Sequence, residues 1–341
     1  MEIKRFLLYC LSVFFHYSGV DFIYRKIFSP ILVILMFHRI SNAFDPLQLS
    51  ISPERVDLIC KHLNEKKMLV SLSSGLDNLK RHQRGCFYAI TFDDGYHDNI
   101  YLKRLALQGH KFTIYIATRL LGAQVLWPFQ LINAIEKCNK KQLDLTCLDL
   151  GLFDLTQKEQ RYDLILFLND WLKQFSYQEM AEKLNIIMEK CQAPPLIDSE
   201  RMLSPSEVAD LHNAGVDIGA HTMNHVILSK LPYDDQEKEI RGCFADIKAL
   251  LNNKDVLHFA YPNGRQEDFN DETVMLVREA GFVSAVTTIY GANRKNVDHF
   301  RLKRIAVTPN SFLSPWGTFS KSRFFSETSG LLSLIKEFFT K

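Results

Sequence analysis

The 341-residue chain has few cysteines, and they are not arranged as a disulfide scaffold or a zinc ribbon would require. Their number is odd, their spacing is wide, and no Cys-x-x-Cys pair occurs. A small secreted domain would carry an even, clustered set. We therefore expect reduced, mostly buried cysteines and a reducing compartment. The seven are Cys10, Cys60, Cys86, Cys138, Cys147, Cys191 and Cys243.

A strong net charge is also absent, because 41 Lys and Arg stand against 39 Asp and Glu, a formal charge of +2. This balance provides no positive field that would collect nucleic acid, so we expect no nucleic-acid partner. The small numbers of Gly (15) and Pro (11) exclude collagen-like and low-complexity chains. The remaining class is an ordinary globular protein, with enough length for one large domain or two medium ones.

No apolar run is long enough to cross a bilayer as a helix. Residues 6–15 are an apolar run of ten after Lys4 and Arg5, without a small-x-small cleavage site behind it. A spanning helix needs about 20 such residues. We expect residues 1–30 to be an apolar and basic helical segment that either packs on the domain or lies at a membrane interface, with Arg25 and Lys26 at its edge. We expect a cytoplasmic protein, peripheral at the inner face of the membrane in the second case.

Strand-like and helix-like segments alternate along most of the chain, which predicts an α/β barrel. Residues 31–37 (ILVILMF) predict a buried first strand. Ser52 followed by Pro53 predicts the start of a helix. The expected strands are 31–37, 87–91, 112–117, 216–220, 257–261 and 283–287, and the expected helices are 53–67, 99–108, 204–215, 233–251 and 271–280.

Residues from about 124 to 200 have a different pattern. Segments 130–138 and 158–190 are polar and helical, with no strand pattern between them, and the stretch ends at Pro194-Pro195. We therefore predict a mostly helical insertion in a domain of residues 31–310. A C-terminal tail with a short helix, residues 311–341, would follow this domain.

Polar side chains directly follow three of the expected strands. The first such site is Asp93-Asp94 in TFDDG. Adjacent carboxylates at a strand end point in different directions, so one can bind a metal ion while the other acts as a base. An Asp-Gly pair is equally typical of a plain turn.

The other two sites are a histidine pair and a rigid turn. His221 and His225 are four residues apart, a spacing that places both imidazoles on one face of a helical turn. Such a pair suits one divalent ion, and a carboxylate would complete a ligand set with open positions for water and substrate. The turn Tyr261-Pro262-Asn263-Gly264 can direct backbone N–H groups toward an oxyanion, although an ordinary turn also explains it. Each motif follows a core strand, as a convergent barrel site requires.

These motifs resemble the signature motifs of the polysaccharide deacetylases, carbohydrate esterase family 4, also called the NodB-homology domain. The resemblance covers roughly residues 31 to 310, interrupted by the helical insertion. It implies a deformed parallel (β/α)7 barrel and metal-dependent removal of acetyl groups from an acetamido sugar. The segments that carry it are LMFHRI, TFDDG, LSPSEVADLHNAGVDIGAHTMNH, FAYPNG and FRLKRIAV.

The resemblance also implies roles for individual residues. Asp94, His221 and His225 would hold a divalent ion, commonly zinc (Zn2+) in this family. The ion would lower the pKa of its water toward ~7 and polarise the substrate carbonyl. Asp93 would be the general base, and the backbone N–H of Asn263 would stabilise the oxyanion.

The chain departs from the family pattern in two places. Many members carry an arginine that orients the base two residues before the turn proline, where this chain has Ala260. We consider Arg304, from another strand, as its replacement. The family's general-acid histidine has no clean match, and His299 is the nearest candidate, with a solvated loop histidine as the alternative interpretation. Without another acid, Asp93 would return the proton to the leaving amine. His38, after the first strand, is interpreted as a core histidine or one that supports a ligand.

We therefore predict a metal-dependent hydrolase that removes N-acetyl groups from a polysaccharide or its lipid-linked precursor, in cell-surface or exopolysaccharide metabolism. One alternative is a non-catalytic carbohydrate-binding protein that retains the metal, as Ala260 and the missing acid suggest. Another is a carbon–nitrogen hydrolase that acts on a small amide. The aromatic residues Trp171, Phe175 and Tyr177 of the insertion would either stack on sugar rings or pack the helices.

Overall fold

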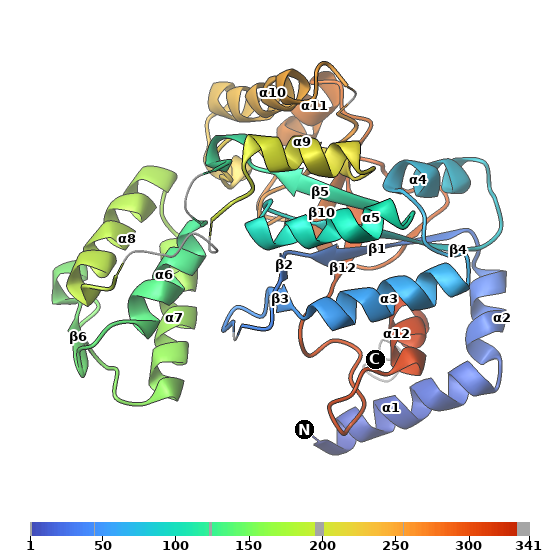
Figure 1. Cartoon of the computed structure of the whole chain (residues 1–341), viewed down its shortest axis with the longest axis horizontal. Helices are drawn as coiled ribbons and strands as arrows, with labels where there is room; N and C mark the ends of the chain where they lie inside the picture. The colour runs from blue at the N-terminus through green and yellow to red at the C-terminus, as the bar shows by residue number, and fades with distance from the viewer. Residues whose placement is uncertain (1, 44, 123–124, 195–200, 255, 333–341) are drawn as a thin grey trace.

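Seven parallel strands form a closed barrel in the computed structural model of the chain, which describes residues 2–332 except 44, 123–124, 195–200 and 255 (Figure 1). The strands are β1 (Ile31–Phe37), β4 (Cys86–Phe92), β5 (Phe112–Ile116), β8 (Asp217–Ala220), β9 (His258–Ala260), β10 (Ser284–Tyr290) and β12 (Leu302–Ala306). Their order around the ring is β1-β12-β10-β9-β8-β5-β4, and β4 pairs with β1 to close it. The predicted deformed (β/α)7 barrel is confirmed.

The barrel strands are buried on both faces, which explains their continuous apolar sequences. All seven residues of β1 are buried, and so are all seven of β4. Strands of a parallel sheet pack against helices outside and side chains inside, so no polar alternation is expected. The deformation lies in uneven pairing. β1 and β4 pair along seven positions, whereas β8 and β9 share the single pair Ala220 and Phe259.

Helices surround the barrel, and their starts follow the local signals in the sequence. Ser52 caps the first of them by accepting a hydrogen bond from the Arg55 N–H, with Pro53 in the first turn. Ser204 and Glu207 form a reciprocal capping box at the start of the helix Pro205–Asn213. The surrounding helices are α3 (Pro53–Glu65), α4 (Leu72–Lys80), α5 (Leu102–Leu107), α9 (Pro205–Asn213), α10 (Tyr233–Leu250) and α11 (Asp271–Glu279). Shorter elements are β2 (Arg39–Ile40), β3 (Ser50–Ile51), β11 (Asn293–Arg294) and the 3-10 helices η1 (His97–Tyr101), η2 (Thr118–Leu120), η3 (Thr146–Leu148) and η5 (Leu228–Lys230).

Besides the shorter elements, one barrel strand and one surrounding helix are missing from the ranges predicted from the sequence. Strand β12 contains Lys303 and Arg304, and two charged residues among five obscure a buried strand in a hydrophobicity pattern. Helix α4 has the sequence LSSGLDNLK, in which serines and a glycine weaken the helical pattern.

The insertion forms a helical unit beside the barrel, at the left of Figure 1. Its helices are α6 (Trp127–Glu136), α7 (Lys158–Leu172) and α8 (Tyr177–Cys191), and they bury a hydrophobic core of their own. The expectation of no strands here was wrong, because β6 (Gln142–Asp144) and β7 (Leu152–Asp154) form an antiparallel hairpin. Its strands are too short for a sequence pattern. The continuous helix expected over 158–190 is split where Ser176 caps α8, and the predicted end of the insertion near 200 lies outside the described residues.

The N-terminal helices α1 (Glu2–Tyr17) and α2 (Val20–Ile27) pack beside the barrel against the C-terminal helix α12 (Lys321–Thr328) (Figure 1). The His16 ring stacks on Phe325, and buried Asp21 accepts a hydrogen bond from Ser329 Oγ at 3.2 Å. Within the described residues no single helix has the length and apolarity to cross a membrane. The helices Phe6–Tyr17 and Val20–Ile27 have the required length and apolarity only when they are taken together, and they are bent by 74° relative to each other.

Candidate metal and catalytic site

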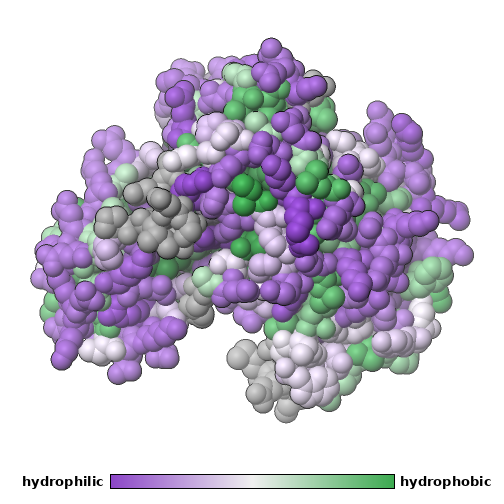
Figure 2. Space-filling model, viewed as in Figure 1, coloured by the Kyte–Doolittle hydropathy of each residue, from purple (hydrophilic) through white to green (hydrophobic). Residues whose placement is uncertain are grey.

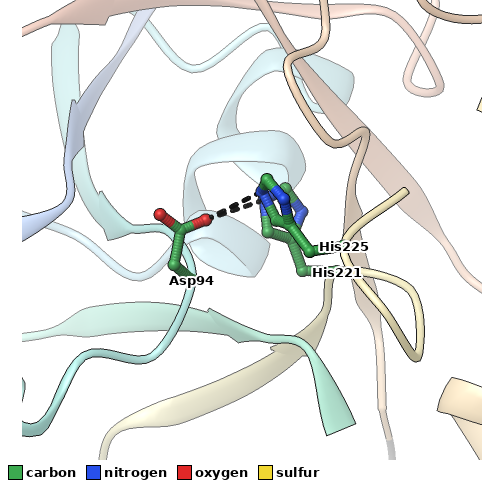
Figure 3. A group of neighbouring side chains, drawn as sticks. All are labelled: Asp94, His221 and His225. Atoms are coloured by element: carbon green, nitrogen blue, oxygen red, sulfur yellow. Dashed lines mark ion pairs between the residues drawn. The ribbon is translucent and has the colours of Figure 1, made fainter. Parts of the chain in front are cut away.

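Three predicted metal ligands meet at the carboxyl ends of the barrel strands (Figure 3). Asp94 follows β4, and His221 directly follows β8. The same oxygen of Asp94, Oδ1, lies 3.3 Å from His221 Nε2 and 3.1 Å from His225 Nε2. Asp94 and His221 are buried and His225 is half-buried. The structure thus brings together side chains that are more than a hundred residues apart in the sequence.

The segment that carries the two histidines is a loop, and the prediction of a helical turn was wrong. Thr222 has φ 64° and His225 has φ 55°, both in the left-handed region. Asp94 is also left-handed, with φ 75°. Non-glycine residues adopt this region at a cost, so contacts from elsewhere must hold these turns.

One of these contacts is made by Glu239, a residue of α10 that the sequence analysis missed. Its Oε2 accepts hydrogen bonds from the backbone N–H groups of Met223 (2.9 Å) and Asn224 (3.0 Å). Its Oε1 accepts from Asn224 Nδ2 at 2.6 Å. Glu239 therefore fixes the middle of the loop between His221 and His225. A signal was present, because Glu239 falls on the buried face of α10, at helical spacing from Gln236, Ile240, Cys243 and Ile247.

A second contact orients His221 itself. Its Nδ1 lies 2.7 Å from the backbone carbonyl of Ala260, so Nδ1 carries the proton and donates it there. Nε2 is then left to bind a metal ion through its lone pair or, when it is protonated, to donate to Asp94 Oδ1. This arrangement is typical of histidines that bind metals. Thr222, between the ligands, has a buried hydroxyl with no hydrogen-bond partner among the described residues.

The donor set fits a divalent metal ion. One atom each from Asp94, His221 and His225 lie within 4.8 Å of one another. Ligands about 2.0–2.2 Å from a common ion are about 3.0–3.6 Å apart in tetrahedral or octahedral geometry. The two His–Asp distances, 3.3 and 3.1 Å, lie in this range. Two neutral imidazoles and a carboxylate suit zinc and similar ions.

Electrostatics keep Asp94 in its charged form. Burial raises its pKa, but the charge of His225 and hydrogen bonds with His221 and His225 outweigh that effect and hold the pKa well below its usual value. Burial lowers the pKa of His221, while its hydrogen bond to Asp94 and the charges of Asp93 and Asp94 raise it, with a net rise. The attraction that produces these shifts would act equally on a metal cation in the same place.

Asp93 lies beside this group and forms an ion pair with Arg304. Arg304 Nη1 and Nη2 donate to Oδ1 and Oδ2 of Asp93, each at 2.6 Å. Arg304 also donates from Nε to the Thr287 carbonyl at 2.7 Å, and is only 1% exposed. Burial raises the pKa of Asp93, but the charge and hydrogen bonds of Arg304 lower it by more than burial raises it. The net pKa is therefore below its usual value. Asp93 is therefore a fixed, ionised carboxylate.

The turn after β9 presents a backbone N–H. Asn263 has φ 57° and Gly264 has φ 62°, so two successive residues are left-handed. Thr288 holds the turn, because its Oγ1 donates to the Asn263 carbonyl at 2.6 Å and its N–H donates to the Gly264 carbonyl at 2.9 Å. Among the described residues none accepts a hydrogen bond from the Asn263 N–H. This N–H is therefore free to donate to a ligand.

These residues open into a cavity of about 470 Å³ between the barrel and the insertion. Asp93, Asp94 and Asn263 line it on the barrel side. The insertion contributes Phe175 and Tyr177, among others. Trp171 is not among the lining residues and packs edge-on against Phe175, with ring centroids 4.8 Å apart. The insertion therefore forms one wall of the site.

The structure does not bring His299 to this cavity. Its carbonyl accepts a hydrogen bond from the Ala285 N–H at the start of β10, 2.8 Å away. This contact places His299 at the amino-terminal end of the barrel, opposite the site, because parallel strands carry their carboxyl ends together. His38 lines the cavity instead, and its charge acts to lower the pKa of both Asp93 and Asp94. Sequence reasoning gave His38 too little weight, although it directly follows β1.

A family model described as polysaccharide deacetylase matches residues 80–285. The chain belongs to the polysaccharide deacetylase family. Polysaccharide deacetylases are hydrolases that cleave the carbon–nitrogen amide bond of acetylated sugars. In Bacillus subtilis (strain 168), the candidate polysaccharide deacetylase YxkH is 28% identical over 129 residues, 37% of this chain and 44% of that protein. The match thus spans less than half the length of that relative.

Solved structures of polysaccharide deacetylases share the fold of this member of the family. The deacetylase PplD from Streptococcus pyogenes, in complex with acetate, has a TM-score of 0.54 and 18% identity, and the match covers 84% of this chain and 96% of PplD. IcaB from Ammonifex degensii has a TM-score of 0.54 and 18% identity, with 82% and 93% covered. At such identities the likeness shows the fold alone.

Proposed function

We propose that the protein is a metal-dependent N-deacetylase of acetamido sugars, with zinc held by Asp94, His221 and His225. The observation that supports this most strongly is the meeting of three ligand atoms beside an ionised carboxylate at the mouth of the barrel. When bound, the ion would supply a Lewis acid for the amide carbonyl and acidify a water molecule.

The chain's own residues would supply the remaining chemistry. Asp93 accepts the proton of the attacking water, since each of its oxygens retains a lone pair beyond the bond to Arg304. Arg304 holds that carboxylate in one orientation. The Asn263 N–H donates to the developing oxyanion. His38, directly after β1, is the side chain that we assign to protonating the leaving amine.

The substrate we propose is an acetamido sugar within a polysaccharide or its lipid-linked precursor. A cavity of about 470 Å³ with an aromatic wall on one side suits a sugar residue and its neighbours. An enclosed site for a small amide would not need the wall that α6, α7 and α8 provide. The two other functions, a metal-retaining binding protein and a small-amide hydrolase, are outcomes of the test.

The test is acetate release from chitooligosaccharides, other acetylated glycans and small amides, with and without added divalent ions. Purified protein should bind about one zinc ion per chain, and His225→Ala should lose it, whereas the exposed surface variant His82→Ala should not. Chelation and Asp93→Asn should abolish acetate release. Metal binding without turnover of any acetylated sugar would instead indicate a carbohydrate-binding protein. Turnover of small amides alone would indicate the other hydrolase.

We also propose that the N-terminal helices hold the protein at the inner face of the membrane. Among the described residues, nine of the nineteen exposed large hydrophobic side chains lie between Phe6 and Phe28. Figure 2 shows hydrophobic residues gathered over α1 and α2. One face of α1 packs on α12 while the other remains exposed, so packing on the domain is compatible with contact with a membrane. Trp316, 73% exposed, packs edge-on against Tyr9 and extends the surface. All seven cysteines are free, which supports a reducing compartment.

Flotation with vesicles that contain anionic lipid tests this location. The double variant Phe14→Gln and Ile27→Gln should reduce the bound fraction severalfold, since both side chains are exposed and contribute apolar area. Met275→Gln is the control, because Met275 is also an exposed large hydrophobic residue but lies on α11. Equal flotation of all three proteins would refute the proposal.

A further inference from the structure

Three cationic side chains line the same cavity as the candidate metal ligands, and each comes from a different segment. Lys173 is the C-cap of α7 in the insertion, Lys230 is the last residue of η5, and Arg265 lies in the turn after β9. Lys230 Nζ donates a hydrogen bond to the Lys173 carbonyl, which joins the barrel to the insertion. All three charges therefore line the cavity, and Lys173 lies near both Lys230 and Arg265.

Lys230 donates to a backbone carbonyl, whereas Lys173 and Arg265 have no ion-pair partner among the described residues. The ion pairs between described residues include neither the Lys173 ammonium nor the Arg265 guanidinium, and no hydrogen bond from either group is present there. Asp268 accepts its bond at 2.8 Å from the backbone N–H of Arg265, not from the side chain. Asp170 also lines the cavity, with Oδ1 accepting from Asn169 Nδ2 at 3.1 Å.

The environment of Lys173 disfavours its charge. Burial lowers its pKa, and although Asp170 and Asp268 act in the opposite direction, Arg265 lowers it further and the net pKa is below the usual value. A bound anion would relieve this repulsion. The hydrogen bond from Lys230 to the carboxyl end of α7 is enough to explain the position of Lys230. It does not explain why Lys173 and Arg265 face the same cavity without partners.

We propose that Lys173, Lys230 and Arg265 form a subsite for a phosphate group carried by the acetamido sugar. This inference rests on the proposed deacetylase function and specifies its substrate as a phosphorylated sugar. Three carboxylates line the cavity, but Arg304 pairs with Asp93 and the proposed metal ion would pair with Asp94, so only Asp170 is left against the three cations. This excess of positive charge matches a phosphate or diphosphate better than the single charge of a uronic acid. The planar guanidinium of Arg265 can bind two phosphate oxygens at once, and the lysines add point charges.

The position of Arg265 fixes where the phosphate lies relative to the reacting acetamido group. Arg265 is two residues beyond Asn263, so their Cα atoms are at most about 7 Å apart. Asn263 belongs to the reacting end of the cavity. The phosphate is therefore on the sugar unit that reacts or on the adjacent one. Sugars linked to a lipid through phosphate and nucleotide diphosphate sugars both meet this requirement.

Binding to the full-length, metal-free protein tests the subsite without any turnover. The probes are N-acetylglucosamine 1-phosphate and the neutral methyl N-acetylglucosaminide, titrated by calorimetry or ligand-observed NMR. We expect the phosphate ester to bind about tenfold tighter at low salt, with the preference shrinking as salt is added. Lys173→Met and Arg265→Met should each remove most of that preference. Lys238→Met, a control on the exposed surface of α10, should leave it unchanged.

Equal affinity for the two probes in the wild-type protein would overturn the proposal, as would a preference that survives in the Lys173→Met, Arg265→Met double variant. Two further probes distinguish the sources of phosphate: a nucleotide diphosphate N-acetylglucosamine and a short-chain lipid phosphate N-acetylglucosamine. The probe that binds more tightly identifies the source of the phosphate. Acetate release from neutral chitooligosaccharides is measured separately, so failure of the deacetylase function and failure of this subsite give different results.

Discussion

Asp93 and Arg304 form a buried, bidentate ion pair in which Nη1 donates to Oδ1 and Nη2 to Oδ2, each at 2.6 Å. The two residues are 211 positions apart, on the end of β4 and within β12. Arg304 makes two further hydrogen bonds, to the Thr287 carbonyl (2.7 Å) and to Thr91 Oγ1 (3.3 Å). The arginine is therefore fixed from several sides and fixes the carboxylate in turn.

Substitution of Arg304 should affect stability and catalysis separately. Arg304→Met leaves the Asp93 carboxylate buried without a partner, so we expect a loss of about 3–5 kcal/mol in the free energy of unfolding. Arg304→Lys keeps the charge but not the two-pronged geometry, so we expect kcat to fall about 10–100-fold with a smaller loss of stability. Urea unfolding and acetate release measure the two effects.

The double variant Asp93→Asn, Arg304→Met is the control for the ion pair. It should be more stable than Arg304→Met alone, because it removes the unpaired charge. Strictly additive losses of stability would show that the two residues are not coupled.

The barrel and the meeting of Asp94, His221 and His225 were predictable because they depend on short-range patterns. Apolar runs predict the buried strands, and polar residues at their ends predict the site, since the carboxyl ends of parallel strands meet at one end of a barrel. The contact of Arg304 with Asp93 could only be suggested. Whether Arg304 or its neighbour Lys303 faces the interior depends on the register of β12. The charges of these two residues also hide β12 in a hydrophobicity pattern.

Local geometry around the ligands was the least predictable part. The spacing of His221 and His225 is typical of a helical turn, yet the segment is a loop with left-handed residues. Its conformation depends on Glu239, which lies on a helix that begins eight residues after His225. His299 resembled the missing acid only by sequence position, and the barrel direction places it at the opposite end from the site.

Glu239 should determine how tightly the metal is held. Glu239→Ala removes the acceptor of three hydrogen bonds that fix the loop between the histidines. We expect the metal dissociation constant to rise about 10–100-fold. Glu239→Gln, which keeps one acceptor oxygen, should show a smaller rise. Competition with a chromophoric chelator measures the affinity.

Glu237→Gln is the matched control for Glu239, because Glu237 lies on the same helix with its side chain 40% exposed and paired with Arg241. Unfolding of the metal-free variants separates a weakened site from a weakened fold. Unchanged metal affinity in Glu239→Ala would show that the loop keeps its conformation without this carboxylate.

His38 should be the residue that protonates the leaving amine. His38→Gln should lower kcat about 10²-fold while metal content stays the same. His299→Gln should leave kcat unchanged, because His299 lies at the other end of the barrel. Kinetics on one acetylated oligosaccharide and metal analysis compare the two variants directly. Full activity of His38→Gln would instead assign proton return to Asp93.

His258 should make the stability of the protein depend on pH. Its Nε2 and Nδ1 each lie 2.8 Å from a serine hydroxyl, Ser73 and Ser284, and burial lowers its pKa to about 4. The unfolded state has a histidine pKa of about 6.5, so below that pH it binds a proton that the native state does not. The contribution of neutral His258 is therefore complete above pH 6.5 and is lost as the pH falls toward 4. At pH 5 the loss is about 2 kcal/mol.

Urea unfolding at pH 7 and pH 5 measures this loss. His258→Asn removes the titrating group, so the difference in unfolding free energy between wild type and variant should shrink by about 2 kcal/mol from pH 7 to pH 5. Other carboxylates and histidines titrate equally in both proteins and cancel in the comparison. The exposed-surface variant His82→Asn should retain the wild-type pH dependence. If His258→Asn also retains it, then His258 is protonated in the folded state at pH 5, and its two serine contacts must tolerate the charge.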